Sequence, residues 1–458
     1  MKPVSVPLQS ESDVNTSERR RAWGKKAIDA QTGALLERDE RAFLHQSVST
    51  PCLNAIAKAQ GIWIEDMSGR RYMDFHGNNV HHIGYGHPRL KEAIAQQMDE
   101  LPFAPRRYTC EPAVELAEKL SQLTAGSLSK CLFATGGSDA MEIALKVARA
   151  ATGRFKTLSF WDAFHGAGFG ASSIGGEQLF RAGAGPLLPG AEHVAPFDSY
   201  RCPYGHDGDE KSARACAGMV RYILEKEGDV AAFIAEPMRA SSIMIPPPGF
   251  WQEIRKACDD HGTLLIFDEI PAGLGKTGKM FASEHYGVTP DILVTGKALG
   301  GGIMPIAATL CRPELDVAGE YAIGHYTHEK SPVAARAALT TIAIIEDEDL
   351  VENARTVGAA ALERLNAMKE RFPLIGDVRG RGFLIGVELV SDRDSKEPAN
   401  AAAEQILYGA LERGLSFKTA MGNILALTPP LTTTRTDMDR ALDIIEACLG
   451  EVSQGGGR

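Results

Sequence analysis

The sequence predicts an α/β fold, and two patterns in it predict this class. From about residue 90, stretches with apolar residues at helical spacing alternate with short apolar runs. The runs are apolar at nearly every position and end in a polar residue or a glycine, which is typical of parallel strands buried on both faces. Functional side chains in such sheets follow the carboxyl ends of the strands, so these positions are the first candidates for a site.

Length and composition limit the class of protein. A chain of 458 residues, 44% hydrophobic and 24% charged, can bury a large core and form more than one domain. Its net charge of -10, without a long basic block, argues against a nucleic-acid partner. No apolar run reaches the roughly eighteen residues of a membrane span, and the polar start has no signal-peptide pattern. The eight cysteines lack CxxC spacing and fit reduced thiols, so we expect a cytoplasmic protein.

The expected elements follow in order along the chain. Residues 17–30 have the pattern of a helix with a basic face, and residues 61–75 form two alternating stretches around the turn DMSGRR. Further helices are expected at 88–101, 111–123 and 138–152. Strands are expected at 130–135, 155–161, 231–237, 262–270 and 291–296.

The pattern changes after residue 335. A long helical stretch covers residues 331–372, and an α+β tail follows with strands at 382–390 and 423–429. We expect this tail to form a second, smaller domain together with the N-terminal β unit. The expected division is an extension with a helix at 1–45, the first part of the small domain at 46–80, the large domain at 81–335 and the rest of the small domain at 336–458.

A glycine turn opens one of the expected helices, in the segment ATGGSDAMEIALK. The free N–H groups at this turn, including those of Gly137 and Ser138, and the Ser138 hydroxyl could hold a phosphate at the positive end of the helix dipole. A plain helix N-cap explains this motif equally well.

Three further strand ends carry chemically useful side chains. Asp268 and Glu269 end one strand, Phe164 and His165 follow a second, and Lys297 follows a third in the segment TGKALGGG. Taken alone, the acid pair is typical of a cap or a salt bridge, and the Phe–His pair of core packing. Lys297 either reaches solvent or is held, partly desolvated, for chemistry.

Two other motifs are set aside. The segment GLGKTG at 273–278 resembles a nucleotide phosphate loop, but the first glycine of that motif would fall on Ile270. The segment HGNNVHHIGYGH holds four histidines whose spacing matches no standard set of ligands, so no metal site is expected.

The strand ends are more informative together than singly. A glycine-rich phosphate site, an aromatic, a strand-end aspartate and, about thirty residues later, a strand-end lysine are what pyridoxal phosphate (PLP) requires. The lysine amine can bind the cofactor aldehyde covalently, and the aspartate can pair with the protonated pyridine nitrogen. The combination therefore predicts a PLP site.

From about residue 45 to near the end, the sequence resembles the class III (ω-) aminotransferase family of fold-type I PLP enzymes. The resemblance rests on GGSDAMEIALKVARAATGR, FHG, IAEP, FDEI, GLGKTG, TGKALGGG and TPPL, which occur in the family's order and spacing. It implies a large domain with a mainly parallel seven-stranded sheet, a smaller α+β domain, and a homodimer.

The resemblance also implies a role for each candidate residue. Lys297 resembles the lysine that the family links to the cofactor, and Asp268 resembles the partner of the pyridine nitrogen. The other implied cofactor contacts are Gly137 and Ser138 at the phosphate, Phe164 and Ile270 on the two faces of the ring, His165 of the FHG segment, Glu236 of the EP segment, and Thr327 from the neighbouring subunit.

Two departures from the family concern the reaction. The segment from Thr327 to Pro332 reads THEKSP where the family has Thr-Phe-Gly-Gly-Asn-Pro, which indicates altered substrate chemistry or drift. Many members also carry an arginine, two residues before the threonine position of TPPL, that grips the carboxylate of an amino or oxo acid. Ala426 stands there, and losing a fork-shaped donor weakens the case for a transaminase.

A third feature resembles the phospho-lyase branch of the same family, which acts on phosphorylated small amines. That branch has an Asn-Asn-Val segment, here residues 78–80 with Asn79 at its centre, and an arginine followed by an aromatic, here Arg107 and Tyr108. Arg106 and Arg107 could bind a phosphate or phosphonate group through guanidinium hydrogen bonds. A surface basic pair explains these arginines equally well.

The leading expectation is a PLP-dependent lyase that removes a β leaving group from a small anionic amine and releases ammonia. The substrate that the resemblance suggests is (R)-1-hydroxy-2-aminoethylphosphonate, which would give phosphonoacetaldehyde. The alternative is an ω-aminotransferase that passes the amino group to pyruvate or another 2-oxo acid. A catalytically silent binding protein is disfavoured because Lys297 and Asp268 are both present.

Overall fold

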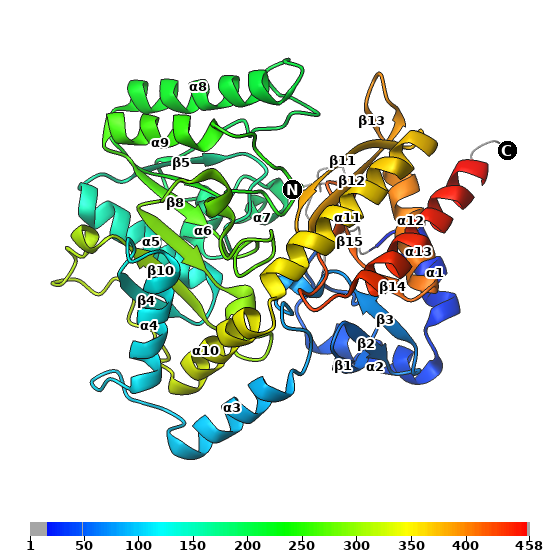
Figure 1. The fold of residues 1–458 in the computed structure, drawn as a ribbon, viewed down its shortest axis with the longest axis horizontal. Helices are drawn as coiled ribbons and strands as arrows, with labels where there is room; N and C mark the ends of the chain where they lie inside the picture. Colours follow the sequence, from blue (N-terminus) through cyan, green and yellow to red (C-terminus); the bar gives the residue numbers. More distant parts are fainter. Residues whose placement is uncertain (1–15, 48, 456–458) are drawn as a thin grey trace.

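The computed structural model describes residues 16–47 and 49–455. The central sheet lies within residues 130–311 and is surrounded by helices (Figure 1). Its strands are β4 (Lys130–Ala134), β5 (Lys156–Phe160), β6 (Ala191–Val194), β7 (Val230–Ala235), β8 (Leu264–Asp268), β9 (Ile292–Thr295) and β10 (Ala307–Cys311). They lie in the order β4-β10-β9-β8-β7-β5-β6, and of these seven strands β10 alone runs opposite to the other six. The mainly parallel seven-stranded sheet expected from the sequence is confirmed.

The uniformly apolar runs have a direct cause in this sheet. Every residue of β7, β8, β9 and β10 is buried, so no face of these strands tolerates the alternating polar residues of a half-exposed strand. Strand β6 and the antiparallel β10 were not singled out in the sequence, since neither ends in a recognisable motif.

Helices pack around the sheet in two groups (Figure 1). Two of them, α8 (Asp209–Glu227) and α9 (Phe250–His261), lie against each other, whereas α3 (Pro88–Glu100), α4 (Glu111–Leu123) and α10 (Pro332–Asp347) pack together at the other end. The helix α5 (Gly137–Thr152) crosses the sheet against β4, β7, β9 and β10, and the short α6 (Phe169–Ile174) and α7 (Gln178–Arg181) follow β5.

Two smaller sheets are built from both ends of the chain. One contains β1 (Ile56–Gln60), β2 (Trp63–Asp66), β3 (Arg71–Asp74) and β14 (Leu415–Ser416), with β14 parallel to β3. The other has the order β11 (Ile375–Arg381), β12 (Leu384–Asp392), β16 (Ile424–Leu427), β15 (Lys418–Ala420), and β13 (Glu397–Pro398) pairs with β12. The N-terminal strands are thus hydrogen-bonded to residues more than three hundred positions later.

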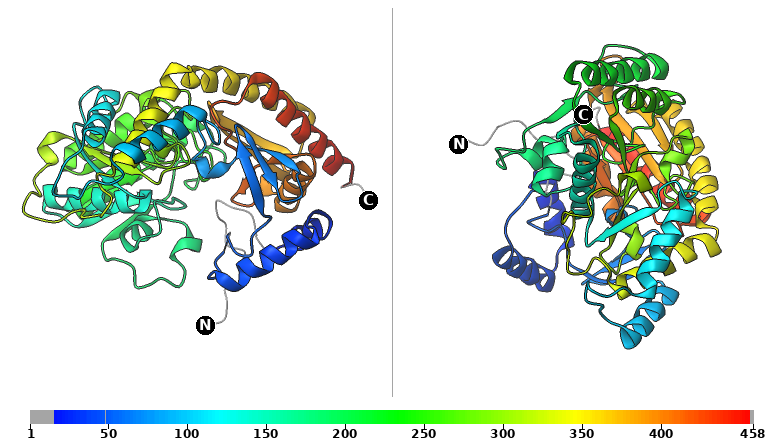
Figure 2. Two further views of the ribbon diagram at one scale, coloured as in Figure 1. Left: turned by 90° about the horizontal axis from the view of Figure 1, so that it is seen from below. Right: turned by 90° about the vertical axis from the view of Figure 1, so that its left-hand side faces the viewer.

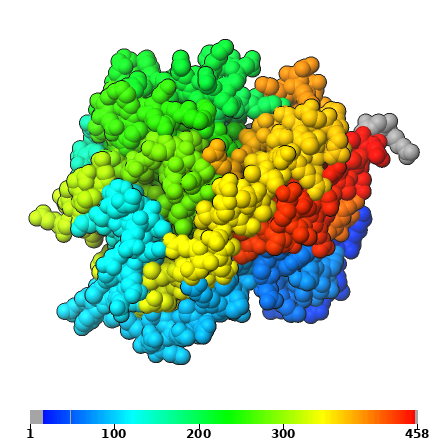
Figure 3. Space-filling model, in the orientation of Figure 1, coloured from blue at the N-terminus to red at the C-terminus, as the bar shows by residue number. Residues whose placement is uncertain are grey.

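The long helical stretch expected at 331–372 is two helices, α10 and α11 (Leu350–Arg371). The break falls at Asp349, whose backbone is left-handed with φ of 51°. These helices, yellow in the space-filling view, form a band across the visible face of the molecule (Figure 3). Along this band α10 packs against α3 and α4, and α11 packs against β11. The last helices, α12 (Asn400–Glu412) and α13 (Arg435–Gly455), pack against each other.

The helix expected at 17–30 is also two elements, α1 (Glu18–Ala27) and α2 (Ala30–Ala42), because Asp29 caps the second helix by accepting a hydrogen bond from the backbone of Thr32. Both lie on one side of the molecule (Figure 2). Trp23 of α1 is buried against Tyr408 of α12. The part of the expected N-terminal extension at residues 1–15 lies outside the described residues.

Candidate active site

A cavity of about 270 Å³ lies where the carboxyl ends of the parallel strands meet. Because Asp268 is the last residue of β8 and Lys297 follows the neighbouring parallel strand β9, both reach the same edge of the sheet. Both side chains line the cavity. The sequence placed these two residues about thirty positions apart, and the parallel pairing of their strands is what brings them together.

Asp268 is held in place by two donors. His165 Nδ1 donates to Asp268 Oδ2 at 2.8 Å, and the backbone N–H of Ile270 donates to Oδ1 at 3.0 Å. Both side chains are almost fully buried, and among the described residues the other ring nitrogen of His165, Nε2, has no hydrogen-bond partner. A carboxylate oriented in this way can face a cationic group in the cavity.

The glycine turn before α5 forms another wall of the cavity. A Cβ on Gly137 would lie 2.8 Å from Ile270 Cδ1, and a Cβ on Gly166 would lie 2.5 Å from Ser138 Oγ. The Ser138 hydroxyl accepts a hydrogen bond from the backbone of Ala167 at 3.0 Å. The close approach explains both glycines, and the free N–H groups of a helix N-terminus are suited to an anion such as a phosphate.

Glu236 follows β7 and is buried in the cavity wall. Its Oε2 accepts a hydrogen bond from the backbone of Ala240 at 2.8 Å. Burial, followed by the negative charge of Asp268, raises the pKa of Glu236 to about 7. Glu236 is therefore partly protonated near neutral pH.

Most of the candidate residues meet at this one cavity. Its lining includes Asn79, Gly137, Ser138, Phe164, His165, Glu236, Asp268, Ile270 and Lys297. Four candidates do not line it. Thr327 is exposed between β10 and α10, and Arg106, Arg107 and Tyr108 lie on the connection between α3 and α4, with Tyr108 65% exposed.

The sequence analysis missed part of the lining. The residues that it did not assign to the site are His76, Asn78, Gly166, Ala240, Ser241, Pro271 and Lys418, of which His76, Asn78 and Gly166 lie inside motifs that it named. Most of them lie within three positions of a recognised motif, so proximity to that motif was the available signal. Lys418 lies in a three-residue strand far along the chain, and nothing in its local sequence marks it.

The two motifs set aside have structural roles. Lys276 of GLGKTG is fully buried and donates to the carbonyl oxygen of Pro429 at 2.8 Å, which ties this loop to the end of β16. His81 and His82 hydrogen-bond to the backbone oxygens of Asp74 and Gly273. Among the described residues no group of three or more histidine, cysteine or carboxylate side chains is arranged to hold a metal ion.

Comparison with known proteins decides the family. The model of the family "Aminotransferase class-III" matches residues 45–449. The chain belongs to the class III aminotransferases. Within the described residues of this chain, no helix is both long and apolar enough to cross a membrane.

Individual class III relatives have different activities. The (R)-1-hydroxy-2-aminoethylphosphonate ammonia-lyase of Vibrio splendidus (strain 12B01) is 45% identical, covering 97% of this chain and 96% of that protein. The leucine/methionine racemase of Thermococcus litoralis is 39% identical, covering 92% and 96%. The crystal structure of a PLP-bound amine transaminase from an uncultivated Pseudomonas species has a TM-score of 0.84 and 33% identity, covering 90% of this chain and 98% of that one.

Pyridoxal phosphate is the cofactor of this class III enzyme. The residues of the cavity fit the group: a glycine cradle without room for Cβ atoms, a helix N-terminus, a buried carboxylate with its histidine, and a lysine at the same sheet edge. The role of each residue toward the cofactor stays a prediction.

Proposed function

We propose that this chain is a PLP-dependent ammonia-lyase acting on a small amine that bears a phosphonate or phosphate group, with (R)-1-hydroxy-2-aminoethylphosphonate as its substrate. The observation that supports this most is 45% identity over 97% of the chain to the Vibrio splendidus lyase of that name. The absence of the family arginine at Ala426 fits it, because a lyase binds no oxo-acid acceptor.

Pyridoxal phosphate joined to a substrate amine withdraws electrons from the amine-bearing carbon and makes a proton on that carbon removable. In the proposal Lys297 is the base that takes this proton at its Nζ. Asp268, oriented by His165, stabilises positive charge on the pyridine nitrogen. The free N–H groups at Gly137 and Ser138 would bind the cofactor phosphate, and Phe164 and Ile270 would cover the two faces of the ring.

The proposed reaction balances without an acceptor. A proton leaves the amine-bearing carbon, and hydroxide leaves the neighbouring carbon, so one water is lost. The enamine that remains becomes an imine, and one water adds to it to release ammonia and phosphonoacetaldehyde. The net change is therefore substrate to aldehyde plus ammonia, with no oxidation.

An aminotransferase is the second candidate, because solved neighbours of the chain are transaminases. That reaction leaves the amino group on the cofactor after one half-turnover and requires a 2-oxo acid to continue. Ammonia release with and without pyruvate separates the two reactions. The lyase predicts many equivalents of ammonia per enzyme without pyruvate. Alanine formed only when pyruvate is added, with no turnover of ammonia in either case, would establish the aminotransferase.

The proposed assembly is a homodimer in which Thr327 of one subunit completes the cofactor phosphate site of the other. The exposed position of Thr327, away from the cavity of its own chain, is compatible with that arrangement. The anion clamp by Arg106, Arg107 and Tyr108 stays a prediction, since these residues do not line the cavity of the described chain.

A further inference from the structure

Lys418 reaches the active-site cavity from the smaller sheet. It is the first residue of β15, and its residue is only 8% exposed. The described lining of the cavity contains two lysines and no arginine, and the other lysine is Lys297. Lys297 has its role at the cofactor in the proposed function, and Lys418 is the second cationic side chain of this lining.

The position of Lys418 in the sheet places this cation beside a residue position that binds substrate in many family members. Lys418 lies directly opposite Ala426 in the antiparallel pair β15–β16. Residues directly opposite each other in such a pair project from the same face of the sheet. Ala426 is the position where many family members carry the carboxylate-binding arginine. The chain therefore has a cation on the same face as the absent arginine, but one strand away.

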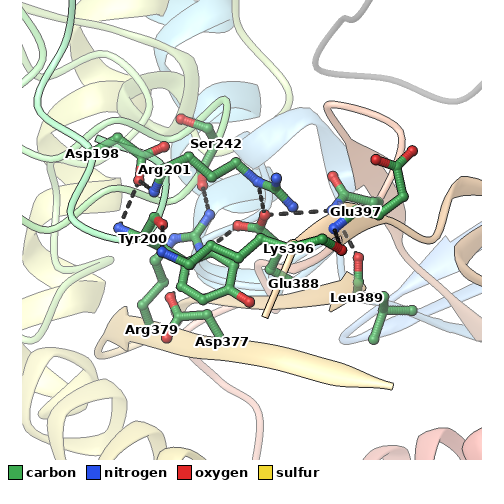
Figure 4. Close-up of polar contacts among 12 residues, drawn as sticks. Asp198, Tyr200, Arg201, Ser242, Asp377, Arg379, Glu388, Leu389, Lys396 and Glu397 are labelled. Atoms are coloured by element: carbon green, nitrogen blue, oxygen red, sulfur yellow. Dashed lines mark hydrogen bonds and ion pairs between the residues drawn. The ribbon is translucent and has the colours of Figure 1, made fainter. Parts of the chain in front are cut away.

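A buried network fixes this sheet against the rest of the site (Figure 4). Glu388 of β12 accepts hydrogen bonds from Arg201 and from Arg379, the latter at 2.8 Å. Arg379 also donates to the backbone oxygens of Ser242 at 2.9 Å and Ile243 at 2.6 Å. Those two residues directly follow Ser241, which lines the cavity.

The network fixes the lysine through strand register. Glu388 of β12 pairs with Ile424 of β16, and β16 pairs with β15. The strand that carries Lys418 is therefore two ladders away from a buried ion-pair network that grips the cavity wall. This arrangement leaves little freedom to the backbone of Lys418. It therefore fixes the distance between Lys418 and Lys297, the residue at the cofactor in the proposed function.

Asn79 supplies a second polar group in the same cavity. It is 5% exposed, and among the described residues its Oδ1 has no hydrogen-bond partner. A buried acceptor oxygen without a partner is unfavourable in the free protein, and a donor from water or from a ligand would satisfy it. The amide nitrogen of the same side chain carries two N–H donors, and these are the atoms that an anion in the cavity would meet.

We propose that Lys418, with the Asn79 amide, binds the phosphonate or phosphate group of the amine substrate and so determines substrate specificity. This inference rests on the proposed function for the identity of the substrate. Both an ammonium and a guanidinium can bind a tetrahedral anion. The proposed difference from the family therefore lies in the position of the cation, one strand away from Ala426, and not in its type.

The test uses the holoenzyme and 2-aminoethylphosphonate, an analogue without the leaving hydroxyl, with propylamine as the uncharged comparison. Binding is followed by the absorbance of the cofactor. Lys418→Met should raise the Kd for 2-aminoethylphosphonate by about 10- to 100-fold, as expected for the loss of a charge-assisted hydrogen bond, and leave that for propylamine within about 3-fold. Lys418→Arg should retain most of the affinity. Lys58→Met, which changes an exposed lysine of β1, is the matched control and should bind like the parent.

Two further variants keep the test decisive. Asn79→Ala, which changes a different element, should raise the same Kd without altering the binding of propylamine. Arg107→Ala tests the alternative clamp. Parent-like phosphonate affinity in both Lys418→Met and Asn79→Ala, or equal losses for phosphonate and propylamine, would overturn the inference.

Failure of the proposed function has a separate signature. An enzyme that releases no ammonia from 1-hydroxy-2-aminoethylphosphonate, yet loses phosphonate affinity in Lys418→Met, would refute the reaction and support the binding site. An enzyme that releases ammonia at parental kcat/KM in Lys418→Met would support the reaction and refute the binding site.

Discussion

Lys297 is held in an unfavourable backbone conformation. Its φ is 45°, and the residue begins the 3₁₀ turn η3 (Lys297–Gly300) directly after an extended glycine. A non-glycine residue in the left-handed region costs about 1 kcal/mol relative to a right-handed one. Strand β9 and the following glycine-rich turn maintain that conformation, and such strain occurs where a side chain must be aimed at a site.

Lys297→Ala should reduce turnover by about 10³-fold or more, because it removes both the covalent anchor and the proposed base. Ammonia release measures the loss of turnover. Mass spectrometry after borohydride treatment measures the loss of the covalent anchor, since the parent should retain the cofactor covalently and the variant should not. Lys276→Met is unsuitable as a control because Lys276 anchors the loop end of β16, so Lys58→Met serves here as well. Activity of Lys297→Ala within 10-fold of Lys58→Met would refute the role.

Glu236 makes the stability of the cofactor-free protein depend on pH. Its folded-state pKa, about 7, is above the ordinary value of 4.5, so between these values the folded state binds more protons than the unfolded state. Stability from this group is present below pH 4.5 and is lost as the pH rises through 7. The free energy of unfolding of the parent, relative to Glu236→Gln, should fall by on the order of 3 kcal/mol across that range. Urea unfolding at several pH values measures the difference, and a difference independent of pH would contradict the raised pKa.

At the scale of elements, the central strands could be predicted and several helices could not. Strands β7, β8 and β9 are buried at every position, so their sequences are uniformly apolar and end at recognisable residues. Helix α8 is exposed along one face, and its polar sequence gave no comparable signal. The break between α10 and α11 at Asp349 was missed although four consecutive acidic residues, 346–349, interrupt the apolar pattern there.

The residues of the candidate site also divide into those that could be predicted from the sequence and those that could not. Asp268 ends β8 and Lys297 follows β9, so the parallel pairing of these two buried strands brings the two residues together. Lys418 comes from the three-residue β15, whose place beside β16 depends on long-range packing. No local pattern in the sequence encodes that contact.

Gly358 shows how one position couples two elements. It lies inside α11, where glycine is about 1 kcal/mol less favourable than alanine, yet a Cβ there would overlap with the carbonyl oxygen of Gly382 in the β11–β12 turn. Gly358→Ala should therefore destabilise the protein by about 2 kcal/mol or more, because backbone must move. Gly218→Ala in α8, where no atom lies within 4 Å of the added Cβ, should stabilise it by about 0.5–1 kcal/mol. Thermal unfolding of both variants measures the contrast, and a stabilising effect at both positions would refute the close approach.

At the scale of the whole molecule, the active site combines distant parts of the chain. The cavity takes Asn79 from the segment after β3, Asp268 and Lys297 from the central sheet, and Lys418 from the C-terminal sheet. Helices α10 and α11 cross between these parts, and the Arg379–Glu388 network joins them near the cavity (Figures 3 and 4). A change in the position of the C-terminal sheet relative to the central sheet would therefore change the distance between Lys297, at the proposed cofactor, and Lys418, at the proposed phosphonate.

The proposed dimer makes a prediction that only a mixed assembly can test. Thr327→Glu places a negative charge where the neighbouring subunit's cofactor phosphate is proposed to lie, and should inactivate a homodimer. Lys297→Ala inactivates its own subunit. In a heterodimer of the two variants, the subunit with Thr327→Glu keeps its own Lys297 and receives an intact Thr327 from its partner, so one site is restored.

Random reassembly of equal amounts gives about half heterodimers, each with one working site of two, so activity should recover to about a quarter of the parent level. Each variant alone should remain inactive. Ammonia release after unfolding and refolding of the mixture measures recovery, and refolded parent enzyme sets the scale. If Thr327 served the cofactor of its own chain, both sites of the heterodimer would be damaged, and the mixture would be as inactive as its components.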